Sequence, residues 1–168
     1  MTTAFKHPEF IVETDWLAAH LHDANVRVLD ATTHLLPKPV LYDPKPGIED
    51  FERGHIPGAQ FVDIEHEISD RSSALHFMMP SAEQFGTAMG ALGVSNDSFV
   101  VCYATANHWW ATRLWWMLRA FGHDKVAVLN GGFQKWQAEG RPTEAGPANA
   151  RARAAFVARA RPDWAVGK

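Results

Sequence analysis

The chain has 168 residues, of which 46% are hydrophobic and 21% charged, and its formal net charge is −3. This length suffices for one domain that buries roughly two thirds of its unfolded surface, and the composition excludes a chain that is disordered over most of its length. The mild charge provides no basic surface for nucleic acid, and no apolar run reaches the ~18 residues that a membrane span needs.

Cysteine usage and the N-terminal residues bear on the location of the protein. Cys102 is the only cysteine, so no internal disulfide can form, which is compatible with a reducing compartment. Residues 1–10 lack the apolar core of a signal peptide. We therefore expect a cytoplasmic protein.

The first elements in chain order are a short strand, a helix and a longer strand. Residues 11–12 can form an edge strand, and Thr14 is placed to cap a helix with apolar residues on its inner side. Residues 26–31, VRVLDA, read as a mostly apolar strand that brings Asp30 to its carboxyl end. Ligands of open parallel sheets bind at that edge, so Asp30 is a candidate site residue.

The next stretch alternates between loops and short elements. Four prolines in residues 36–46 predict an irregular loop, because proline lacks a backbone donor. Residues 47–51 suggest one or two helical turns. The Pro-Gly turn within residues 54–59 then leads into a predicted strand over residues 60–64.

A second helix is predicted after Pro80. Residues 69–79 show no periodicity and indicate a surface loop. Ser81 is a good N-cap, and Gln84 stands where a capping box would return its side chain to the cap. Gly93 marks the end of this helix.

The stretch from Phe99 to Trp136 predicts strand, loop, helix, strand, turn and helix. Residues 99–103 and 125–129 are short apolar runs, and Gly122 ends the helix between them. Two buried parallel strands joined by a helix form a right-handed crossover. We therefore expect any chemistry to lie in residues 104–109, after the first of these strands.

The composition changes after the last helix. Gly140-Arg141-Pro142 breaks that helix, and the following residues are rich in alanine and arginine. We therefore predict one domain over residues 1–142 and a tail or interdomain linker over residues 143–168.

With these segments placed, residues 9–142 resemble the rhodanese (sulfurtransferase) family. The chain is most similar to the N-terminal domain of two-domain thiosulfate or 3-mercaptopyruvate sulfurtransferases. Four matching blocks occur in the family's order, at residues 26–31, 51–64, 79–94 and 113–136. The resemblance implies an α/β fold, an open and mainly parallel five-stranded sheet with helices on both faces.

The resemblance also identifies where a catalytic residue would stand. Active domains of the family carry a cysteine directly after the central strand, and in this sequence that position holds Ala104. A persulfide intermediate needs a thiolate, which inward-pointing N–H groups beside a helix N-terminus stabilise. Alanine cannot carry sulfur, so the resemblance implies a noncatalytic domain. The rest of the equivalent loop is Thr105, Ala106, Asn107, His108 and Trp109.

Cys102 is the one alternative sulfur carrier. It lies inside the predicted strand, where a free cysteine is commonly a small core residue, whereas a nucleophile must be approachable. Alternation puts residues 100, 102 and 104 on one face of that strand.

Several further residues have expected structural roles. Asp30 and Arg53 can form a salt bridge that braces the site, while His55 and Asp63 flank the Pro-Gly turn. Arg113 agrees with the family's helix. These five residues are expected to hold the scaffold or a domain interface. Nearby tryptophans cannot all share one helix face, so part of this set should be exposed: Trp109, Trp110, Trp115 and Trp116.

Two functional hypotheses follow. The first is a noncatalytic rhodanese domain that packs against a catalytic rhodanese domain, the missing C-terminal half, near a small sulfur-containing anion. The second is a self-sufficient sulfurtransferase that moves sulfane sulfur through a Cys102 persulfide. Neither needs a cofactor, and the nine scattered histidines predict no metal site.

Overall fold

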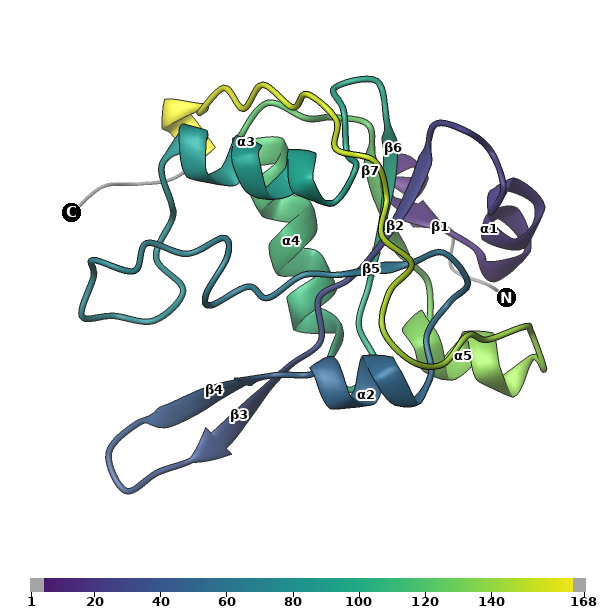
Figure 1. Ribbon diagram of the computed structural model, residues 1–168, viewed down its shortest axis with the longest axis horizontal. Helices are drawn as coiled ribbons and strands as arrows, with labels where there is room; N and C mark the ends of the chain where they lie inside the picture. The colour runs from purple at the N-terminus through teal and green to yellow at the C-terminus, as the bar shows by residue number, and fades with distance from the viewer. Residues whose placement is uncertain (1–4, 165–168) are drawn as a thin grey trace.

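The computed structural model describes residues 5–164 (Figure 1), and residues 1–4 and 165–168, the outer ends of the predicted domain and tail, lie outside it. Five strands form one sheet in the order β1–β7–β6–β2–β5, and every neighbouring pair is parallel. This confirms the predicted α/β fold with its open, mainly parallel five-stranded sheet. The strands are β1 (Ile11–Val12), β2 (Val26–Asp30), β5 (Gln60–Phe61), β6 (Phe99–Tyr103) and β7 (Val126–Leu129).

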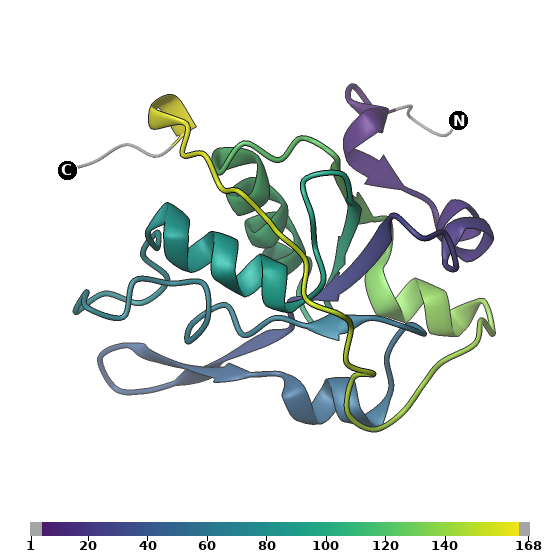
Figure 2. The ribbon, with the colours of Figure 1, turned by 45° about the horizontal axis from the view of Figure 1, so that its top comes forward.

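Helices cover both faces of the sheet (Figure 2). On one face, α3 and α4 share a buried cluster with Val100 and Cys102 of β6. On the other face, α1, α2 and α5 share a second cluster with Val101 and Tyr103 of the same strand. The predicted alternation of β6 is therefore confirmed. The helices are α1 (Thr14–His20), α2 (Ile48–Arg53), α3 (Ala82–Ala91), α4 (His108–Ala120) and α5 (Gly132–Ala138), with 3-10 turns η1 (Pro8–Phe10) and η2 (Pro162–Trp164).

The helix caps agree in part with the sequence. Ser81 is the N-cap of α3 and its hydroxyl accepts a hydrogen bond from the N–H of Gln84, as predicted. The Gln84 side chain does not return to the cap; its amide donates to the carbonyls of Glu67 and Ser69 and so ties the preceding loop to α3. Thr14 begins α1 instead of capping it. Its hydroxyl donates to the carboxylate of Glu139, which is distant in sequence and is brought near by the fold.

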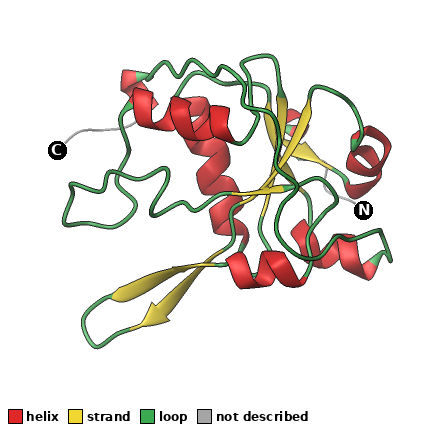
Figure 3. Ribbon diagram, viewed as in Figure 1, coloured by secondary structure: helices red, strands yellow, loops and turns green. Residues whose placement is uncertain are grey.

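Two predicted elements have other bounds or another structure. The strand predicted over residues 60–64 pairs only at β5, two residues long. The irregular loop predicted over residues 36–46 is wrong: β3 (Thr33–Pro37) and β4 (Tyr42–Pro46) form an antiparallel hairpin outside the main sheet (Figure 3). Its register puts Pro37, Pro44 and Pro46 in alternate pairs, which exchange no hydrogen bonds, so the missing donors cost the hairpin nothing.

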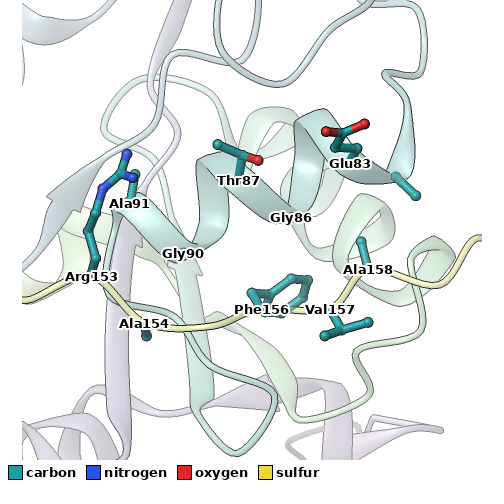
Figure 4. Close-up of a pocket in the computed structure, with 11 residues that line it drawn as sticks. Glu83, Gly86, Thr87, Gly90, Ala91, Arg153, Ala154, Phe156, Val157 and Ala158 are labelled. Atoms are coloured by element: carbon teal, nitrogen blue, oxygen red, sulfur yellow. The ribbon is translucent and has the colours of Figure 1, made fainter.

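The segment after residue 142 is bound to the domain although it has little regular structure. Residues 153–158 run along α3 (Figure 4), where the N–H of Ala154 donates to the carbonyl of Gly90 at 3.0 Å. The N–H groups of Arg159 and Arg161 then donate to the carbonyls of Phe121 and Ala120 at the end of α4. A Cβ at Gly90 would lie 2.5 Å from the Ala154 carbonyl oxygen, so this close approach requires glycine. Phe156 is buried in the α3 and α4 cluster, beside an open groove of about 450 Å³. We call residues 150–161 the strap; a role in linking to a further domain stays a prediction.

Candidate functional site

The site predicted from the sequence lies where the strand order of the sheet reverses. The chain proceeds from β2 to β5 on one side and from β6 to β7 on the other, with Asp30 and Tyr103 in register at the adjacent ends of β2 and β6. Residues 104–107 connect β6 to α4. Asn107 caps that helix, since its side-chain oxygen accepts from the N–H of Trp109 at 3.0 Å. The loop therefore occupies the usual ligand edge of an open sheet.

Ala104, the residue at the position of a catalytic cysteine, is a core residue in this structure. Its exposure is 0%, and it belongs to the same buried cluster as Cys102 and Trp110. Phe77 covers Trp110 with 4.8 Å between the ring centres. On the other side, a Cβ at Gly132 would lie 2.9 Å from the Ala104 carbonyl oxygen. The first residue of the loop is thus tightly enclosed.

A buried hydrogen-bond chain joins the loop to the end of β2. The N–H of Thr105 donates to the hydroxyl of Thr32 at 2.8 Å, and this hydroxyl donates to Oδ1 of Asp30. The N–H of Thr32 donates to the same carboxylate oxygen at 2.8 Å. Burial raises the pKa of Asp30 to about 6, and the hydrogen bonds from Thr32 only partly offset this effect. The carboxylate therefore bonds to its own loop and not to a cation.

The suggested salt bridge between Asp30 and Arg53 does not form. Arg53 is on the exposed side of α2 and pairs with Asp50, one helical turn before it, at 2.8 Å. Asp50 also accepts a hydrogen bond from Nε2 of His34 at 2.5 Å, which joins α2 to the hairpin. Asp30 is fully buried, and a solvated arginine at the end of α2 does not reach it.

His55 and Asp63 each have a local partner. The His55 ring stacks on Phe51 at 3.8 Å, and its Nδ1 donates to the Phe51 carbonyl at 2.8 Å. Its Nε2 lies 3.7 Å from a carboxylate oxygen of Glu144, so His55 contacts the segment that precedes the strap. Asp63 pairs with His66 at 2.8 Å, near the surface. Both contacts are compatible with the scaffold role predicted for these residues.

The second half of the loop is open to solvent. Ala106 and His108 are exposed, and the Trp109 side chain is 70% exposed. The His108 ring packs on the start of α5, where a Cβ at Gly132 would lie 2.8 Å from its Cε1 atom. His108 and Trp115 also line an apolar cavity of about 420 Å³ between α4 and the N-terminal residues. The expectation that part of the tryptophan set is exposed is confirmed.

Arg113 holds the loop of residues 65–79 against α4. Its guanidinium donates to the carbonyl of Phe77 and lies 4.9 Å from the ring centre of Trp116. Phe77 has a φ of 60°, the left-handed region that side chains seldom adopt, and burial lowers the pKa of Arg113. Arg113 therefore has a structural contact in this domain.

Cys102, the alternative sulfur carrier, lies inside β6 with an exposure of 0%. It packs between Val100 and Ala104 on the face covered by α3 and α4. Burial raises the pKa of its thiol, which disfavours the thiolate that sulfur transfer needs.

Thr32 is the site residue that sequence reasoning missed. A weak signal was present, because a threonine two residues after a strand-terminal aspartate can bond that carboxylate locally. Nothing in the sequence indicates its second partner, Thr105, which lies far along the chain.

The described residues, 5–164, contain neither a candidate metal site nor a candidate membrane span. Within that range, no three histidine, cysteine, aspartate or glutamate side chains come together as a metal site would require. The helices of the same range are all too short or too polar to cross a bilayer.

Comparison with protein families gives one match over most of the chain. A model of the rhodanese-like domain matches residues 13–139. Thiosulfate/3-mercaptopyruvate sulfurtransferase 2 of Arabidopsis thaliana is 41% identical over 141 residues, which cover 84% of this chain and 40% of the plant protein. The 3-mercaptopyruvate sulfurtransferase of Escherichia coli K12 is 41% identical over 134 residues, which cover 76% of this chain and 44% of the bacterial protein.

Solved structures give the same result. The crystal structure of SseA from Escherichia coli, described as a 3-mercaptopyruvate sulfotransferase with the rhodanese fold, matches with a TM-score of 0.81 and 36% identity. The match covers 92% of this chain and 56% of that chain. The present chain spans less than half the length of the curated relatives named above.

Proposed function

The chain belongs to the family of rhodanese-like sulfurtransferase domains, and from this premise we propose that it is a noncatalytic domain, one half of a thiosulfate or 3-mercaptopyruvate sulfurtransferase. The observation that carries the proposal is Ala104, a fully buried methyl group at the position where the nucleophile of an active domain would stand. Without a thiol there, no persulfide can form on the loop.

The alternative, a Cys102 persulfide, is less well supported. A sulfur donor would have to reach a thiol that lies inside a central strand of the sheet and has an exposure of 0%. The raised pKa of this thiol also opposes its ionisation at neutral pH. Both properties favour a core role for Cys102.

The partner of such a domain would be a catalytic rhodanese domain. Among residues 5–164, the exposed large apolar side chains support a docking role, because all but Phe5 and Val157 lie on segments that leave the carboxyl ends of the strands. We call this set the carboxyl-edge face: Leu36, Val40, Leu41, Tyr42, Ile48, Leu75, Met78 and Trp109. Figures 1 and 2 show the β3–β4 hairpin extending away from the rest of the domain.

The hairpin itself suggests how a partner docks. A two-stranded hairpin is only marginally stable by itself in water, so burial of its apolar side chains against a partner would stabilise it. The tip of this hairpin exposes 88% of Val40 and 68% of Leu41. Prolines 44 and 46 remove donors from the free edge of β4, so a partner cannot extend this edge as a further strand. Docking would therefore occur through side-chain packing. A small sulfur-containing anion would bind to the active loop of the partner, and this domain would form one side of the pocket around it. We propose that the assembly is cytoplasmic.

Sulfur transfer from thiosulfate to cyanide tests the noncatalytic assignment. We expect the folded 168-residue chain and its Cys102→Ala variant both to give no thiocyanate above the uncatalysed rate. Thiosulfate/3-mercaptopyruvate sulfurtransferase 2 of Arabidopsis thaliana provides a positive control for the assay. Activity in the chain that is lost in Cys102→Ala would overturn the proposal and make Cys102 the sulfur carrier.

Hydrogen exchange tests whether a catalytic domain docks on the carboxyl-edge face. We expect the gene's reading frame to continue past Lys168 into a second domain with a cysteine directly after its central strand. In the full-length product, residues 36–42 should exchange more slowly than in the 168-residue chain, whereas residues 22–25, at the opposite edge of the sheet, should be unchanged. Equal exchange of residues 36–42 in both proteins would refute docking through the carboxyl-edge face.

A further inference from the structure

The loop after β6 already satisfies some of its own donors with side-chain oxygens. The N–H of Thr105 bonds to the hydroxyl of Thr32, and the N–H of Trp109 bonds to the side chain of Asn107. The Asn107 bond is an ordinary helix cap, formed within three residues. The Thr32 bond has no such local origin, since it crosses from the end of β2 to the loop.

The Thr32 hydroxyl is used both as a donor and as an acceptor in this arrangement. Its hydroxyl proton goes to Asp30, and its oxygen accepts the N–H of Thr105. Thr32 and Asp30 both have exposures of 0%, so water does not replace these bonds. The methyl group of Thr32 is equally confined, because a Cβ at Gly47 would lie 2.5 Å from it. The first amide of the loop is therefore held by an oxygen that is itself bonded to a carboxylate.

Such an arrangement opposes an anion at residue 104. A thiolate or persulfide there needs N–H groups that have no better acceptor, and Thr105 supplies the nearest one in the chain. The Thr32 oxygen competes for that N–H, and the Asp30 carboxylate adds a like charge behind it.

We infer that Thr32 locks this loop against anion binding, so that the domain is inactive for two separate reasons, the missing thiol and the occupied donor. This inference rests on the proposed function, a noncatalytic domain. It predicts that a cysteine introduced at residue 104 will not become an acidic thiol until the Thr32 hydroxyl is removed.

The titratable groups around this position come from four elements. Asp30 and Tyr103 lie at the ends of β2 and β6, His55 follows α2, and His108 begins α4. Removing the Thr32 hydroxyl takes from Asp30 a hydrogen bond that favours its charged form. Asp30 would then be neutral over a wider pH range, which further lowers the cost of a thiolate at residue 104.

The test measures the pKa of the introduced thiol from the ultraviolet absorbance of its thiolate. It compares three variants: Ala104→Cys, Ala104→Cys/Thr32→Val and Ala104→Cys/Thr32→Ser. Valine keeps the confined methyl group and removes the hydroxyl, whereas serine keeps the hydroxyl. We expect the pKa to fall by about one unit in the valine variant, the effect of one hydrogen bond to a charged group, and not to fall in the serine variant. An equal or higher pKa with valine would overturn the inference.

A second measurement avoids the introduced cysteine and any folding defect that it causes. In Thr32→Val with Ala104 unchanged, the Thr105 amide should exchange its proton at least tenfold faster, and in Thr32→Ser it should stay protected. Unchanged exchange in Thr32→Val would also overturn the inference. Sulfur transfer by the unsubstituted chain would instead refute the noncatalytic assignment, so the two failures are distinguishable.

Discussion

The buried carboxylate of Asp30 makes the stability of this domain depend on pH in a defined direction. Its pKa is about 6 in the folded chain, against 3.8 as the ordinary value, because burial disfavours the charged form. The protonated form of Asp30 therefore favours the folded chain. Its contribution to the free energy of unfolding is fully present below about pH 4 and is lost as the pH rises through about 6. A difference of about two pKa units corresponds to a loss of about 3 kcal/mol between these limits.

Asp30→Asn removes this titration. Chemical denaturation of both proteins from about pH 4 to about pH 8 gives the free energy of unfolding at each pH. The difference between variant and original chain should grow in favour of the variant by about 3 kcal/mol across this range. A constant cost of the substitution shifts the whole curve and leaves this change unaffected.

Asp97→Asn is a matched control, because the Asp97 side chain is 97% exposed at the opposite edge of the sheet. Its curve should run parallel to that of the original chain. If the Asp30→Asn curve is also parallel, Asp30 is already ionised without penalty in the fold, and the assigned role of its burial is wrong.

Three further predictions concern the strap and the clamp that Arg113 forms between α4 and the loop of residues 65–79. Phe156→Ala should lower the free energy of unfolding by about 3–5 kcal/mol, whereas Val157→Ala, at a side chain 58% exposed, should change it by less than about 0.5 kcal/mol in denaturant titrations; equal effects would contradict a bound strap. Gly90→Ala should lower the melting temperature, although alanine favours helices by about 1 kcal/mol, because its Cβ would meet the strap backbone; a higher melting temperature would show that the strap does not lie there. Arg113→Ala should speed hydrogen exchange at residues 75–79 and leave the core of α3 protected, and unchanged exchange would remove the clamp role.

Much of the fold could be predicted because its signals are local. Strands β2 and β6 lie within the predicted runs at residues 26–31 and 99–103, and Ser81 caps its helix, since side-chain periodicity and capping depend on neighbours within a few residues. The place of Ala104 at the position of a catalytic cysteine was implied by the resemblance to the rhodanese family. Its burial was not predicted, although alternation placed it on the same face as Val100 and Cys102.

The failures share one physical cause. Prolines predict a loop at residues 36–46 only while their register is unknown, and pairing across the hairpin places each one where no donor is needed. The composition of the strap resembles that of a linker, yet a few contacts to glycines of α3 hold it in place. In both cases the partner is distant in sequence, so no local pattern reports it.

The sequence by itself determined the order of strands and helices, the absence of a thiol at residue 104 and the single cysteine at residue 102, because these depend on residue identity and on neighbours along the chain. Only the tertiary structure decided that Asp30 bonds to Thr32 and not to Arg53, and that Thr32 occupies the amide of Thr105. The bond between Thr32 and Thr105 joins segments that meet only after the sheet has assembled, and burial decides which polar groups pair there.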